Sequence, residues 1–256
     1  MIEGNSQSKA RRRILILGAA SGIAQAYARL RAAGNANFVL LGRQPERLVS
    51  IGNDLLARGA ATAESVTSDL GDVAAIDATV NALKARFGAF DEIIVAYGVL
   101  GNQAEAEKDT AAARKIIDVN FTSVVLWVLA LLREHPASRP LSLVGIGSVA
   151  GDRGRASNFV YGASKAGLER LLEGLAQKHA DSDIHILTVK PGFVDTPMTA
   201  GMVDRKLLLA SPEQVARDIQ RAVSRRQRVV YTPWFWWVIM LIIRNLPWFF
   251  FKRLKI

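Results

Sequence analysis

Short apolar runs alternate with longer helical patterns along most of this chain of 256 residues, and this alternation constrains the fold more than any other feature. Apolar runs of about four to eight residues between turn residues are typical of buried strands, and the segments between them have the length of helices. Strand–helix–strand units of this kind build a parallel sheet covered by helices. The sequence therefore predicts an α/β fold with one doubly wound parallel sheet.

The pattern divides into expected elements and three expected regions. Strands are expected near 14–17, 37–41, 63–67, 92–96, 141–146, 184–190 and 228–231. Helices are expected near 22–33, 45–58, 72–87, 111–134, 159–180 and 212–224. We expect a flexible tail at 1–10, one folded domain at 11–232 and a membrane-interface or interaction tail at 233–256. The long loop at 193–211 is a candidate substrate lid.

Composition excludes several classes of protein. The chain has no cysteine, which excludes disulfides and thiolate catalysis, and its three scattered histidines indicate no metal site. Its net charge of +10 is concentrated at the two ends. Seven basic and no acidic side chains follow Ser224, whereas the body of the chain is nearly neutral. We therefore expect no nucleic-acid partner.

A glycine-rich turn follows the first expected strand, in the segment ILILGAASGIA. Glycine permits a tight turn and a close approach of backbone N–H groups to a pyrophosphate, which then sits at a helix N-terminus. Such a turn alone can also be a plain loop. We expect Gly18, Ser21, Gly22 and Ile23 to bind a dinucleotide in a Rossmann-type site, with the small Ala24 permitting close helix–strand packing.

The end of the second expected strand bears on the choice of cofactor. A Rossmann unit that binds NAD usually presents an acid there, but this chain has Gly42 followed by Arg43. A guanidinium matches a 2′-phosphate in a bidentate way. Arg43 could also be an ordinary surface charge. We predict NADP(H) as the preferred cofactor, with NAD(H) as the alternative.

The segment GSVAGDRGRASNFVYGASKAG carries the strongest signal for chemistry. Tyr161 lies four residues before Lys165, so both side chains share one face of a helix. The phenol of a free tyrosine has a pKa of about 10, and a neighbouring cation favours its ionised form. The Ser148 hydroxyl can hold the same substrate oxygen. These groups suit proton transfer to a ketone or from an alcohol, although one Tyr-x-x-x-Lys match could arise by chance.

Together these features resemble the short-chain dehydrogenase/reductase family, from about Arg12 to Thr232. The resemblance implies that Ser148, Tyr161 and Lys165 are catalytic and that Asn120 anchors a proton-relay water. It also implies further cofactor contacts, namely Asp69, Leu70, Gly98, Pro191, Val194 and Thr196, with Tyr161 and Lys165.

Two positions depart from the family pattern. The third glycine of the turn is Ala24, and the segment after the fourth expected strand reads Val95-Ala96-Tyr97-Gly98, in which only the glycine of the family's Asn-Asn-Ala-Gly remains. Tyr97 either has a role beside the cofactor or substrate or packs in the core. The family likeness also implies a homodimer or tetramer through the helices at 111–134 and 159–180.

The C-terminal segment suggests a membrane surface. Ten uninterrupted apolar residues run from Trp234 to Ile243 before Arg244, and WFFFKRLKI follows Pro247. As a helix, ten residues reach about 15 Å, which is half of a bilayer core. Tryptophans with basic flanks instead suit an interfacial anchor on anionic lipid, and the alternative is burial against protein. We expect a cytoplasmic protein that is peripheral on the membrane.

This tail and the segments VAYGVLG and PGFVDTPM resemble keto-reductases that complete the epimerisation of a polyprenyl-phosphate sugar in cell-wall biosynthesis. The resemblance implies a lipid-borne 2-keto sugar as substrate and a flavin oxidase as partner. Two alternatives stay open: a reductase of another keto-lipid, such as a ketoacyl chain or keto-sphingoid base, and a non-catalytic NADP-binding scaffold.

Overall fold

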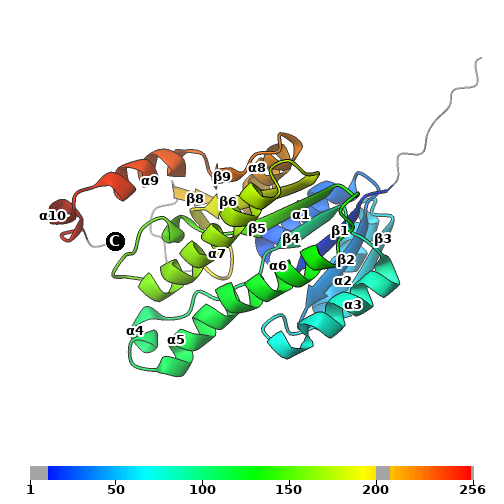
Figure 1. Cartoon of the computed structure of the whole chain (residues 1–256), viewed down its shortest axis with the longest axis horizontal. Helices are drawn as coiled ribbons and strands as arrows, with labels where there is room; N and C mark the ends of the chain where they lie inside the picture. Colours follow the sequence, from blue (N-terminus) through cyan, green and yellow to red (C-terminus); the bar gives the residue numbers. More distant parts are fainter. Residues whose placement is uncertain (1–10, 200–207, 255–256) are drawn as a thin grey trace, which may run out of the picture.

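The protein is built around one seven-stranded sheet in which every strand runs parallel to its neighbours (Figure 1). The computed structural model describes residues 11–199 and 208–254. The strand order is β3-β2-β1-β4-β5-β6-β9. These strands are β1 (Arg13–Leu17), β2 (Asn37–Gly42), β3 (Thr62–Thr67), β4 (Glu92–Val95), β5 (Leu141–Ile146), β6 (Ile184–Pro191) and β9 (Val229–Thr232). The expected α/β fold with a Rossmann-type sheet is thereby confirmed.

Burial explains why the central strands read as continuous apolar runs. Ile14 to Leu17 in β1 have no exposed surface, because helices cover both faces of the sheet. The edge strand β3 contains Thr62 and Glu64 and is only partly buried, as expected for a strand with one neighbour. The seven expected strands therefore all form, with ends that differ by one residue or so.

Helices pack on both faces of the sheet. One face is covered by α1 (Gly22–Ala32), α2 (Pro45–Ala57) and α8 (Pro212–Ser224), whose apolar side chains form one core cluster with the sheet. The other face is covered by α3 (Ile76–Phe87), α6 (Ser123–Arg133) and α7 (Phe159–Lys178), which form a second cluster around Trp127. In Figure 1 the long α6 and α7 lie side by side in front of the sheet.

The helix expected at 111–134 forms as Thr110–Arg133. It consists of α5 (Thr110–Ile117), a π-helical turn η2 (Asp118–Thr122) and α6, and the π-helical turn inside it was not expected. The turn contains Asn120, which is fully buried. Thr110–Arg133 as a whole is long and apolar enough to cross a membrane by length and composition. Its residues Trp127 and Val128 have no exposed surface and belong to the second core cluster, as in a core helix.

The C-terminal segment is helical and is only partly separate from the domain. The helices α9 (Phe235–Asn245) and α10 (Trp248–Phe251) run along one end of the molecule (Figure 1). In α9, Trp236 and Met240 are buried one helical turn apart, in a third cluster that also contains Val149. The boundary expected after Thr232 therefore does not divide the chain into two independently packed parts.

Several short elements were not expected from the sequence. They include α4 (Gln103–Ala106), the 3-10 helix η3 (Val149–Gly151) and the paired strands β7 (Phe193–Val194) and β8 (Leu209–Ala210). The two strands bound the loop expected to be a lid, and residues 200–207 of that loop lie outside the described residues. The tail expected at 1–10 also lies outside them.

Candidate functional site

A cavity of about 390 Å³ lies at the carboxyl ends of the strands and brings most of the expected site residues together. Its lining includes Gly18, Ser21, Gly22, Ile23, Arg43, Asp69, Leu70, Gly98, Ser148, Tyr161, Lys165, Pro191, Val194 and Thr196. Asn120 is the one expected site residue that does not line it. The sheet changes its winding direction between β1 and β4, which is where ligands bind in open α/β sheets.

The glycine-rich turn forms one wall of this cavity. Gly18 has a φ of +86°, and a Cβ atom there would lie 2.7 Å from Cβ of Tyr97, so both conformation and space require glycine. Gly22 opens α1 after its N-cap Ser21, and a Cβ on Gly22 would lie 3.2 Å from Thr196. This leaves the helix N-terminus open toward the cavity. The turn therefore fits the pyrophosphate of a dinucleotide.

Ser148, Tyr161 and Lys165 form another wall of the cavity. Ser148 follows β5 and accepts a hydrogen bond from the Ala150 backbone N–H at 3.1 Å. Tyr161 and Lys165 lie on the first two turns of α7, as their spacing predicts. The Lys165 ammonium lies 5.8 Å from the centre of the Tyr161 ring and donates to the carbonyl of Ile146 at 2.8 Å. The three side chains thus converge on one part of the cavity.

Burial controls the ionisation of these groups. It raises the pKa of Tyr161 to about 12, while the polar contact with the Ser148 hydroxyl and the charge of Arg155 lower it. The expectation of a phenol pKa lowered by Lys165 is therefore corrected, because burial has the largest effect on this phenol. Burial also lowers the pKa of Lys165 to about 8, against the opposing effect of the Glu169 charge. The lysine can change charge close to neutral pH.

Asn120 lies behind this wall and connects two segments of the site. Its side-chain amide donates to the Val99 carbonyl at 2.7 Å and to the Ser164 hydroxyl at 3.1 Å. Its oxygen accepts from the Val99 backbone N–H at 2.7 Å. A Cβ on Gly98 would lie 2.8 Å from that oxygen. Asn120 therefore fixes the loop after β4 against α7, the helix of Tyr161 and Lys165.

The structure adds Arg47, which sequence reasoning missed, to the cavity and places Tyr97 there as well. Arg47, on the first turn of α2, lines the cavity together with Arg43, which precedes this helix, and donates to the Ala20 carbonyl at 3.1 Å. A second arginine four residues after Arg43, at the start of the helix expected at 45–58, is the signal that could have found it. Tyr97 lines the cavity and also packs in the second core cluster, with its hydroxyl 3.0 Å from that of Ser123. Both roles considered for Tyr97 thus fit its position.

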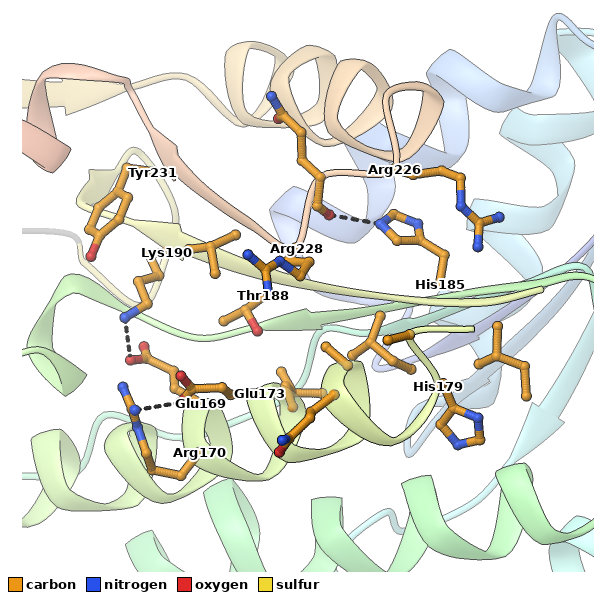
Figure 2. A pocket seen from close by; sticks show the side chains of 18 of the residues that line it. Glu169, Arg170, Glu173, His179, His185, Thr188, Lys190, Arg226, Arg228 and Tyr231 are labelled. Carbon is orange, nitrogen blue, oxygen red and sulfur yellow. Dashed lines mark hydrogen bonds and ion pairs between the residues drawn. The ribbon is translucent and has the colours of Figure 1, made fainter. Parts of the chain in front are cut away.

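A second and larger cavity, of about 1160 Å³, lies between α7 and the edge of the sheet at β6 and β9 (Figure 2). Its lining is rich in charged side chains, such as Arg170, Arg226 and Arg228, and it does not include the glycine-rich turn. We therefore assign the dinucleotide site to the smaller cavity. Among residues 11–199 and 208–254, no group of three or more His, Asp or Glu side chains is placed to hold a metal ion.

Fold and cavity together define a Rossmann-type nucleotide-binding protein with a tyrosine and a lysine in its binding site. Residues 12–206 match the family model of the short chain dehydrogenases. The chain therefore belongs to the short-chain dehydrogenase/reductase family and is an oxidoreductase of that family.

Individual relatives agree with this assignment. The chain is 36% identical to an uncharacterized oxidoreductase of Mycobacterium tuberculosis, over 94% of this chain and 96% of the relative. It is 34% identical to the cis-4-hydroxycyclohexanecarboxylate dehydrogenase of Sinomonas cyclohexanicum, over 82% of this chain and 88% of the relative. The fold matches that of a 3-oxoacyl-[acyl-carrier protein] reductase from Brucella melitensis, which was solved with NAD. The TM-score is 0.78 at 22% identity, and the match covers 90% of this chain and 99% of the reductase.

The lowered pKa of Lys165 predicts a specific dependence of stability on pH. The folded pKa is about 8 against an ordinary 10.5, so stability rises as pH increases through this window and the ammonium loses its proton. Lys165→Met removes this titration. We compare the free energy of unfolding of the variant with that of the unmodified protein. The difference, variant minus unmodified protein, should therefore be largest below pH 8 and should become smaller toward pH 10.5. Denaturant unfolding at about pH 7 and about pH 10 measures this difference.

Lys84→Met is the matched control, because Lys84 is 53% exposed and pairs with Glu134 at the surface. Its relative free energy of unfolding should stay nearly constant over the same range. An equally constant difference for Lys165→Met would contradict the depressed pKa.

Proposed function

We propose that the protein is an NADP(H)-dependent reductase that converts a ketone on a lipid-borne substrate to an alcohol. The observation that carries the proposal is the convergence of Ser148, Tyr161 and Lys165 on the cavity that the glycine-rich turn also lines. Ser148 holds the substrate oxygen, and Tyr161 gives it a proton. Lys165 orients this end of the site and supplies positive charge beside the phenol.

A nicotinamide dinucleotide fits the residues that line this cavity and, when bound, supplies the hydride for the reduction. The N-terminus of α1 with Gly18, Ser21 and Gly22 would hold its pyrophosphate. Asp69 and Leu70, after β3, would lie beside the adenine, and Pro191, Val194 and Thr196 would hold the nicotinamide end. Asn120 keeps the loop after β4 against α7, so the two ends of the site keep their spacing.

The preference for NADP(H) over NAD(H) is supported by two arginines. Arg43 and Arg47 line the cavity next to Gly42, where an NAD-binding site would present an acid. Both guanidinium groups are on exposed residues, so a phosphate could reach them without prior rearrangement of the core. Two cations at this place favour a ligand with an additional phosphate.

The proposed substrate is a polyprenyl-phosphate 2-keto sugar held at a membrane surface. The sequence of the site and tail resembles the keto-reductase subunit of decaprenylphosphoryl-ribose 2-epimerase, which implies a flavin oxidase that produces the ketone. The exposed part of the tail supports a lipid surface. It consists of Trp234, Trp237, Val238, Leu241, Ile242, Trp248, Phe249, Phe250 and Leu254, which we call the apolar patch.

Basic side chains accompany the apolar patch, which favours anionic lipid. Arg244, Lys252 and Arg253 are all exposed beside it. The apolar side chains supply most of the binding energy, because each contributes about 1.5–3 kcal/mol when fully buried, against about 1 kcal/mol for each basic residue. We therefore propose that the protein is cytoplasmic and binds the membrane from one side.

A small cyclic hydroxy acid is the second candidate substrate. It is favoured by the relative from Sinomonas cyclohexanicum, a cis-4-hydroxycyclohexanecarboxylate dehydrogenase that is 34% identical over 82% of this chain. A panel separates the candidates: a polyprenyl-phosphate 2-keto pentose in vesicles, a 3-ketoacyl thioester, and cis-4-hydroxycyclohexanecarboxylate with oxidised cofactor. Nicotinamide absorbance gives the rate and mass spectrometry identifies the product. No turnover of any member would favour the scaffold alternative.

The proton donor is tested by Tyr161→Phe. Removing one general acid should lower kcat by at least about 100-fold. Cofactor affinity, measured by fluorescence titration with NADPH, should remain close to that of the unmodified protein, since the ring is retained. Near-normal turnover by Tyr161→Phe would remove Tyr161 from the mechanism.

The cofactor preference is tested by Arg43→Ala. Loss of a charge-assisted phosphate contact should weaken NADPH binding by about 10- to 100-fold and leave NADH binding nearly unchanged. Arg58→Ala, at the other end of α2 and paired with Asp54, is the matched control and should change neither affinity. A preference of the unmodified protein for NADH would show that the assignment is wrong.

The lipid surface is tested by Ile242→Glu combined with Trp248→Glu, at two side chains of the apolar patch that are 62% and 69% exposed. The pair should abolish sedimentation with vesicles of phosphatidylglycerol and phosphatidylcholine, because two carboxylates would have to enter an anionic interface. High salt should weaken binding of the unmodified protein without abolishing it.

Fold and cofactor affinity should survive this double substitution, because Trp236 and Met240 stay in place. Val49→Glu is the control, since Val49 is 54% exposed on the distant helix α2. Undiminished sedimentation of the double variant would contradict membrane contact through the apolar patch.

A further inference from the structure

A buried carboxylate lies directly behind the segment that carries Ser148. Glu169 is 3% exposed and lies on α7, four residues after Lys165 and eight after Tyr161. This spacing places the three side chains along one face of the helix. Glu169 does not line the cofactor cavity, and no step of the proposed reaction uses it.

The two oxygens of this carboxylate have different partners. One accepts a hydrogen bond from the Ser148 backbone N–H at 3.1 Å. The other pairs with the ammonium of Lys190 on β6 at 2.8 Å (Figure 2). Lys190 also pairs with Asp152 at 2.5 Å, and the Tyr231 hydroxyl donates to the second oxygen of Asp152 at 2.9 Å. The single ammonium of Lys190 therefore lies between two carboxylates inside the protein.

The backbone around Ser148 is shaped to receive this carboxylate. A Cβ on Gly147 would lie 2.7 Å from one oxygen of Glu169, and a Cβ on Gly151 would lie 2.8 Å from both. Real Cβ atoms do not approach so closely, so glycine on each side of Ser148 leaves the space that Glu169 occupies. The segment from 147 to 151 thus curves around a single charged group.

Glu169 and Lys190 also form a partition between the two cavities. Both line the larger cavity between α7 and the sheet edge (Figure 2). Ser148 lines the smaller cavity. Behind Ser148 there is consequently an ion pair with open space beyond it. A backbone segment in such a place keeps its position only through the specific contacts that it makes.

We propose that Glu169 is a positioning residue for the Ser148 hydroxyl. The inference rests on the proposed function, in which Ser148 and Tyr161 share one substrate oxygen. Burying two carboxylates and one ammonium is costly, and such a group of charges stabilises less than an apolar core of the same volume. Its benefit lies in geometry, because a charged acceptor holds a backbone N–H more firmly than a neutral one. Lys190, held by Asp152, fixes the direction of that acceptor.

The proposal is tested with two substitutions at one position. Glu169→Gln keeps the shape but leaves one acceptor oxygen for two donors, the Ser148 N–H and the Lys190 ammonium. Glu169→Asp keeps the charge but shortens the side chain by one methylene group, so the carboxylate cannot reach both donors. Glu173→Gln is the matched control, on the same helix one turn later, with a side chain that is 64% exposed.

Hydrogen–deuterium exchange reports the position of the segment without any substrate. Exchange of peptides that contain residues 147–151 should accelerate by about 10-fold or more in Glu169→Gln and Glu169→Asp, and stay unchanged in Glu173→Gln. Thermal melting identifies a variant that has failed to fold, in which case the other variant at the position decides. A folded Glu169 variant with the same exchange as Glu173→Gln would overturn the proposal.

Turnover of the panel substrate with the highest kcat/KM then tests the consequence for the reaction. Both Glu169 variants should lose about 10-fold or more in kcat, with KM for the cofactor nearly unchanged, because the lost contact orients Ser148 and not the dinucleotide. Faster exchange with undiminished kcat would reduce Glu169 to a structural residue and overturn the inference. Absence of turnover in the unmodified protein would overturn the proposed function instead, and the exchange result would still decide whether Glu169 holds the segment.

Discussion

The parallel direction of all seven strands decides where chemistry can occur in this protein. Parallel strands deliver their carboxyl ends to one edge of the sheet, and the winding reverses between β1 and β4. Gly18 after β1, Gly98 after β4, Ser148 after β5 and Pro191 at the end of β6 therefore meet around one cavity. Tyr161 and Lys165 line the same cavity from the first two turns of α7.

The strands could be predicted because their signal is local. A strand that is buried on both faces appears in the sequence as a short apolar run between turn residues. This pattern can be recognised without knowing which strands lie next to it in the sheet. The π-helical turn at Asp118–Thr122 has no such signal. It is associated with the contacts of the Asn120 side chain to Val99 and Ser164, which lie 21 and 44 residues away in the chain. The apolar helical pattern alone therefore predicted the helix but not the π-helical turn inside it.

The residues of the site divide in the same way. Those that belong to a motif, such as Gly18 and Tyr161, could be predicted because the motif fixes their types and spacing. Glu169 was missed because a glutamate next to an arginine in a helix reads as a solvated surface pair. Its burial depends on the ion pair with Lys190, which lies 21 residues later in the chain, on β6. In the sequence, Lys190 is a single charged residue at the end of an apolar run and gives no sign of this pairing. Charges that compensate each other across elements are visible only in three dimensions.

The inner face of the C-terminal tail contacts the domain, and these contacts fix the orientation of the apolar patch on its outer face. On its inner face Trp236 lies so close to Gly192, a cavity residue, that any Cβ there would come within 1.9 Å of the indole nitrogen. Arg153, in the loop after Ser148, donates to the Leu246 carbonyl at 2.7 Å and lies 3.7 Å over the ring of Phe251. The tail is therefore fixed to segments on both sides of the candidate site. The apolar patch on its outer face consequently keeps a constant orientation relative to the cavity, which a flexible anchor joined only through Thr232 would not provide.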